Sequence, residues 1–124
     1  MLKKTISYTD YNGNKRSEDF YFNLSKAELM EMEMRTAGGL IEKFARVAKS
    51  QNPDELVDIF KDVVLRAYGE KSADGRRFIK NDEVKEAFMQ TEAYSELFME
   101  LATNAEAAAA FFNGIIPQEP TVKE

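Results

Sequence analysis

The sequence contains neither cysteine nor histidine, and these two absences remove whole classes of chemistry. Without cysteine no disulfide framework can form, which fits a reducing compartment. Without either residue, a Cys/His zinc site and a nucleophile activated by histidine are excluded. There is also no apolar run of the roughly 18 residues that a membrane span needs, and residues 1–10 lack the apolar segment of a signal peptide. We therefore expect a cytoplasmic protein without a metal, a cofactor or a membrane partner.

Length and charge narrow the class further. The chain has 124 residues, 44% of them hydrophobic, which suits a single domain with one core. Residues 1–81 carry 15 basic and 13 acidic side chains, whereas residues 82–124 carry 2 and 9. Each contact with a nucleic-acid phosphate needs a lysine or arginine, so this acidic end argues against a nucleic-acid partner. A basic protein partner fits it better.

The first 23 residues have the pattern of a β-hairpin. Apolar and polar side chains alternate over residues 2–9 and again over residues 18–22. Asn12-Gly13 lies between them, and this dipeptide readily adopts the positive φ angles of a tight turn. Two roles remain open for the predicted hairpin, since it either covers the helices only or pairs its open edge with another chain.

Residues 25–68 have the spacing and capping signals of helices. Ser25 with Glu28 three residues later forms a capping box, which predicts a helix from about residue 26 to residue 35. Asn52 before a proline predicts the start of a longer helix that ends near Tyr68 with Gly69 as its cap. The first helix is rich in methionine, which suits a core or an adaptable binding groove: Met30, Met32 and Met34.

Residues 69–81 are expected to form a basic loop with a turn at Asp74-Gly75. The turn lacks the alternating oxygen ligands of a calcium loop. Arg76, Arg77 and Lys80 are too few for a convincing nucleic-acid patch. We expect these side chains to pair with carboxylates of the same chain or of a second copy, which would be a self-association surface.

Residues 82–116 form an acidic helical end, with candidate N-caps at Asn81, Thr91 and Asn104. Glu92, Glu96 and Glu100 follow one another at four-residue spacing, with no lysine or arginine four residues away. Each like-charged pair costs about 0.2–0.5 kcal/mol in an isolated helix, so folding alone does not explain the pattern.

We therefore predict a partner-binding surface made of these glutamates and the apolar cluster that follows: Phe111, Phe112, Ile115 and Ile116. Such a surface would hold an amphipathic helix of a partner or a second copy of the chain. The competing interpretation is a solvated acidic face with phenylalanines that only close the core.

Together these patterns predict an α+β protein that is predominantly helical. An N-terminal β-hairpin is followed by about five helices in one compact domain over residues 1–117. Residues 118–124 lack the apolar content to pack and are expected to be a flexible tail.

Longer stretches of the sequence resemble the tail assembly chaperones of long-tailed bacteriophages and prophages. The likeness extends from about Asp10 to Pro117, and its clearest phrases are GRRFIKN, QTEAYSELFMELATNAEAAAAFF and NGIIP. The resemblance implies a non-enzymatic protein of the infected bacterial cytoplasm, absent from the mature virion. It would bind the tape measure protein and keep it soluble while tail tube protein, the second candidate partner, assembles. In such families a ribosomal frameshift commonly gives a longer second product.

Two other classes of function compete with this one. An enzyme using paired carboxylates, such as Glu100 or Asp74 with Arg76, needs acid and base groups in contrasting environments, and nothing in the sequence marks such a pair. A helical regulator or inhibitor of a host protein would use the same surfaces as a chaperone. Only the identity of the partner separates those two functions.

Overall fold

The computed structural model describes residues 1–50 and 52–116, and the predicted flexible tail at 118–124 lies outside the described residues. Within them the α+β prediction is confirmed. The strands are β1 (Leu2–Thr9), β2 (Lys15–Phe22), β3 (Tyr68–Lys71) and β4 (Phe78–Ile79). The helices are α1 (Lys26–Arg35), α2 (Leu40–Ser50), α3 (Pro53–Ala67), α4 (Asp82–Met89), α5 (Glu92–Thr103) and α6 (Ala105–Ile115).

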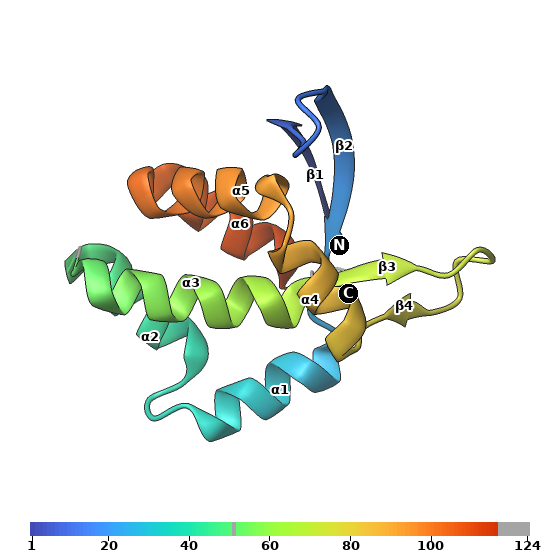
Figure 1. Cartoon of the computed structure of the whole chain (residues 1–124). Coiled ribbons are helices and arrows are strands. Elements are labelled where there is room, and N and C mark those ends of the chain that lie inside the picture. Colours follow the sequence, from blue (N-terminus) through green and yellow to red (C-terminus); the bar gives the residue numbers. More distant parts are fainter. Residues whose placement is uncertain (51, 117–124) are drawn as a thin grey trace.

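The predicted hairpin forms in the register that its turn sets. β1 and β2 are antiparallel, with Leu2 opposite Phe22 and Thr9 opposite Lys15. Gly13 has a φ of 85°, the left-handed conformation for which glycine is suited. Partly buried positions, and the buried Ile6, alternate with exposed ones along β1, and the hairpin extends away from the helical body beside α5 (Figure 1).

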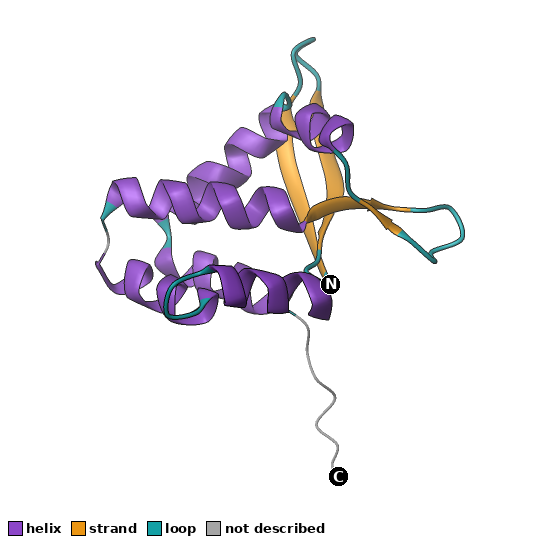
Figure 2. Cartoon of the chain, turned by 90° about the horizontal axis from the view of Figure 1, so that it is seen from below, coloured by secondary structure: helices purple, strands orange, loops and turns teal. Residues whose placement is uncertain are grey.

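The predicted basic loop at 69–81 contains two strands, which is a correction to the sequence-based expectation. β3 pairs with β2 and β4 pairs with β3, so the sheet has the order β1-β2-β3-β4. Gly69 does not cap α3, because that helix ends at Ala67 with Tyr68 as its C-cap. Gly69 instead pairs with Tyr21 in the sheet. The two short strands and their turn form an arm that projects from the body (Figures 1 and 2).

Gly69 is required in this arm for a steric reason. A Cβ atom at this position would lie 2.7 Å from Cε2 of Phe78 and 2.9 Å from the carbonyl oxygen of Ile79. We expect Gly69→Ala to lower the free energy of unfolding by about 1–3 kcal/mol, because a backbone oxygen cannot move aside without breaking the β3–β4 pairing. Urea denaturation measures the loss. Gly75→Asn, in the open turn of the same arm, is the control, and an equal loss in both variants would contradict this explanation.

The helices begin where their capping residues predict. The Ser25 side chain accepts from the backbone N–H of Glu28, whose carboxylate accepts from the N–H of Ser25, so the capping box is complete. Asn52, Asn81, Thr91 and Asn104 each accept a backbone N–H of the helix that they start. Because these signals are local, sequence and structure agree on the helix starts.

The core lies where the sheet meets α3, α4, α5 and α6. Phe22 is fully buried, and its ring lies 5.6 Å from Tyr68, 5.9 Å from Phe88 and 5.0 Å from Phe111. α3 runs through the middle of the molecule, with α5 and α6 on one side and α1 and α2 on the other (Figure 1). α5 lies between the hairpin and α3 and contacts both (Figure 1).

Candidate functional site

We define the acidic stripe as Glu92, Glu96 and Glu100. Side chains from the hairpin of the same chain contact two of these three carboxylates. The Nζ atom of Lys4 lies 2.9 Å from Oε2 of Glu100. The hydroxyl group of Tyr11 donates to Oε2 of Glu92 at 3.2 Å. Both partners come from the other end of the chain, whereas the predicted lack of counterions concerned only neighbours on the same helix.

Glu96, in the middle of the stripe, is exposed. Its side chain lines an open depression of about 460 Å³ between α5 and the hairpin, with Tyr8 and Arg16 among the other lining residues. Within residues 1–50 and 52–116, no side chain forms an ion pair or a hydrogen bond with the Glu96 carboxylate. Of the three glutamates, Glu96 is therefore the one best placed to meet another molecule.

The predicted apolar part of the partner surface lies inside the protein. Phe111, Phe112 and Ile115 are at most 5% exposed and belong to the main core. Ile116 is partly buried and packs against the same core. The backbone carbonyl of Ile115 also accepts from the N–H of Leu24 at 3.0 Å, which ties the end of α6 to the connection between β2 and α1. These four residues close the core, so they offer no exposed patch in the folded chain.

The basic residues of the arm divide into two groups. Nζ of Lys80 points inward, 2.6 Å from the carbonyl oxygen of Asn23 and 2.9 Å from both carboxylate oxygens of Glu28. Lys80 therefore pairs with a carboxylate of its own chain, which is the first of the two alternatives predicted for the basic loop and not the self-association alternative. Arg76 and Arg77 are exposed at the turn of the arm.

Hydrogen bonds within the turn hold these two arginines in place. The Asp74 carboxylate accepts from the hydroxyl group of Ser72 at 2.7 Å and from the N–H of Arg76 at 3.0 Å. The N–H of Arg77 donates to the Ser72 hydroxyl oxygen at 3.0 Å. The arm thus presents two guanidinium groups on a defined turn.

The Lys80–Glu28 pair gives the protein a specific sensitivity to acid. Partial burial acts to raise the pKa of Glu28, but hydrogen bonds from the Ser25 backbone and from Lys80 outweigh it and hold that pKa below its usual value. For Lys80, burial outweighs the nearby carboxylate and lowers the pKa of the ammonium group. Folding therefore favours the ionised form of the Glu28 carboxyl group and disfavours the charged form of Lys80, so the stability that depends on acid comes from Glu28.

Acid should remove the contribution of Glu28. A depressed folded-state pKa gives stability that is complete above the unfolded pKa, which is about 4.3 for glutamate, and that is lost as the pH falls through the folded-state pKa. We expect wild-type protein to exceed Glu28→Gln in free energy of unfolding at pH 6, and the difference to shrink towards pH 3. Urea titrations at several pH values measure it, with Glu31→Gln on the same helix as the control. A difference that grows on acidification would contradict the assignment.

An apolar groove that was not predicted from the sequence lies beside the N-terminal half of α5. It has a volume of about 400 Å³, and the partly buried Tyr94 lines it with Lys61, Thr91, Glu92, Ser95 and five further apolar or aromatic side chains. We define these five as the apolar groove: Tyr11, Val57, Met89, Phe98 and Met99. Four of them keep much of their surface in solvent, at 76% for Tyr11, 57% for Met99, 38% for Val57 and 37% for Met89. Because they come from the hairpin turn, α3, α4 and α5, only the tertiary structure brings them together.

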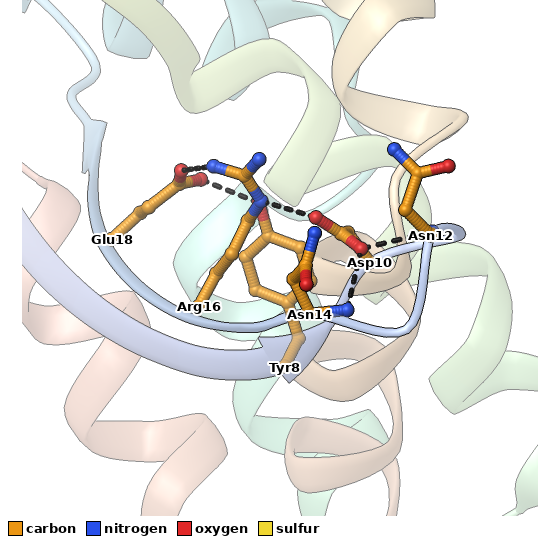
Figure 3. Close-up of polar contacts among 6 residues, drawn as sticks. All are labelled: Tyr8, Asp10, Asn12, Asn14, Arg16 and Glu18. Atoms are coloured by element: carbon orange, nitrogen blue, oxygen red, sulfur yellow. Dashed lines mark hydrogen bonds and ion pairs between the residues drawn. The ribbon is translucent and has the colours of Figure 1, made fainter.

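A polar network holds the hairpin turn, and with it Tyr11, in position (Figure 3). The Asp10 carboxylate accepts from the backbone N–H groups of Asn12 and Asn14 at 2.9 Å and from Nε of Arg16 at 2.6 Å. The hydrogen bond from Arg16 is the main reason that the pKa of Asp10 lies below its usual value. Arg16 also meets Glu18, with Nη1 and Oε2 3.3 Å apart. The turn is therefore fixed by hydrogen bonds, and through Tyr11 it forms one wall of the groove.

An exposed apolar groove with charged side chains at its rim is typical of a protein that binds other polypeptides. The family model described as phage tail assembly chaperone matches residues 1–123. The chain belongs to the phage tail assembly chaperone family. No curated protein and no solved structure matches it. None of the helices in residues 1–50 and 52–116 is long and apolar enough to span a membrane.

Proposed function

We propose that this chain is a non-enzymatic chaperone that binds the tape measure protein and keeps it soluble during tail assembly in the host cytoplasm. It would leave the tail before the virion is complete. The observation that carries the proposal is the apolar groove beside α5, in a chain of the tail assembly chaperone family. Apolar surface left in water costs free energy, and a partner that covers it recovers that energy.

The proposed contact surface consists of the apolar groove and the two nearest glutamates of the stripe. Glu92 lies on the rim of the groove, and Glu96 lies one turn further along α5. Glu100 serves the hairpin through Lys4 instead. Apolar burial would supply most of the affinity, and the carboxylates would select partners with basic side chains.

A second surface supports self-association. The exposed Arg76 and Arg77 would meet the acidic stripe of a neighbouring copy, and such a head-to-tail contact repeats into a ring or a filament. Arg76→Glu combined with Arg77→Glu should reduce the mass measured by light scattering. An unchanged mass distribution in the double variant would remove this contact from the proposal.

Co-expression tests the function directly. The tape measure protein encoded in the same phage genome is produced with and without this chain, and its soluble fraction is measured after centrifugation. The proposal expects it in the supernatant, co-purifying with this chain, only when both are made. Tape measure protein that stays equally soluble or equally insoluble in both cases contradicts the proposal. Capture of a host protein in its place would favour a regulator or inhibitor.

A further inference from the structure

We infer that the apolar groove takes one amphipathic helix that carries basic side chains along one flank and acidic side chains along the other. The inference rests on the proposed function, because it names the kind of tape measure segment that the groove would bind. Its evidence is the nature of the groove walls and the opposite charges at the rim.

The walls favour a helix over an extended peptide. An extended peptide needs backbone partners for its N–H and C=O groups, as at a sheet edge. Here α3 and α5 present side chains, since their interior backbone groups are bonded within each helix. At the hairpin turn, the N–H groups of Asn12 and Asn14 already donate to Asp10. A helical occupant satisfies its own backbone and needs only apolar side chains to fill the groove.

The rim carries one charge of each sign. Glu92, at the start of α5, keeps acceptor capacity after its single hydrogen bond from Tyr11, because a carboxylate has about four lone-pair sites. Lys61, on α3, is exposed, and no ion pair joins its ammonium group to any residue in the part of the chain described here. Asp58 lies one turn before Lys61 and weakens its field, so the acidic flank of the occupant should matter less than the basic flank.

Three synthetic helical peptides test the inference. They share one stripe of leucines at i, i+3, i+4 and i+7 and differ in their flanks, which are lysine on one side and glutamate on the other, lysine on both, or glutamate on both. Isothermal titration calorimetry against the full chain measures each affinity. We expect the mixed peptide to bind most tightly, by about two- to fivefold per matched flank. Turning the mixed peptide end for end exchanges its two flanks, so one of its two directions always matches the rim. The direction of binding therefore need not be known in advance.

Charge reversal at the rim should redirect the preference. Lys61→Glu should bind the all-lysine peptide best, and Glu92→Lys the all-glutamate peptide best. Val57→Thr with Met99→Gln should weaken binding of all three, whereas Met30→Gln with Met34→Gln, two exposed methionines of α1, should not. Equal affinities for the three peptides, no binding, or self-association that depends on Val57 and Met99 would each overturn the inference.

The two proposals fail in different ways. If no peptide binds and the tape measure protein is still kept soluble, the helix assignment is wrong and the chaperone function stands. If the peptides bind as expected while the tape measure protein precipitates, the groove assignment stands and the proposed function fails.

Discussion

Replacing Phe88 by alanine should lower the free energy of unfolding by about 3–5 kcal/mol, the range for deletion of a large buried aromatic ring. Phe88 is 2% exposed, and its ring stacks on Tyr68 with centroids 4.1 Å apart and planes 11° apart. It also lies 5.4 Å from Phe20 and 5.5 Å from Tyr94. The residue thus joins the sheet to α4 and α5, and no neighbour can fill its space without leaving another contact.

Urea denaturation followed by circular dichroism measures this loss. Met34→Ala is the control, because Met34 is 80% exposed and its truncation should change the free energy by no more than about 0.5 kcal/mol. A loss below about 1 kcal/mol for Phe88→Ala would show that the aromatic cluster does not organise the core.

The largest functional effect should follow from placing charge in the apolar groove. Val57→Asp with Met99→Asp should weaken the complex with the tape measure protein by about tenfold or more, since fully burying a valine or methionine contributes about 1.5–3 kcal/mol. Buried aspartates without partners would add a further penalty. The soluble fraction of co-expressed tape measure protein should fall accordingly.

The matched control moves the same change to another surface. Met30→Asp with Met34→Asp alters two exposed side chains of α1 and adds the same charge. This variant should keep the tape measure protein as soluble as wild-type protein does. If both double variants fail equally, added negative charge and not the groove explains the loss.

Local signals predicted much of this fold, and long-range contacts account for what they missed. The turn at Gly13 and the N-cap at Ser25 depend on a few neighbouring residues, so sequence alone was sufficient. β3 and β4 were missed because they are short and owe their existence to pairing with distant β2. Lys4 was missed as the partner of Glu100 because 96 residues separate the two.

The candidate site likewise combines local features that the sequence shows with long-range contacts that it does not show. The glutamate pattern of α5 is visible in the sequence, but the sequence could not show that Phe111 and Phe112 face the core. The sequence alone does not distinguish an apolar side chain that packs in the core from one that is exposed and binds a partner. The groove could not be predicted from the sequence, because Val57 and Met99 lie on different helices and line one groove only after folding.

Site-specific photo-crosslinking tests the central claim most directly. Benzoylphenylalanine is placed at position 99 in the groove or at position 34 on α1, both exposed in the free protein, and the chain is irradiated with co-expressed tape measure protein. The claim predicts a covalent adduct with the tape measure protein from position 99 and none from position 34. An adduct from position 34 alone, or none from position 99 while the two proteins still co-purify, would place the contact elsewhere and contradict it.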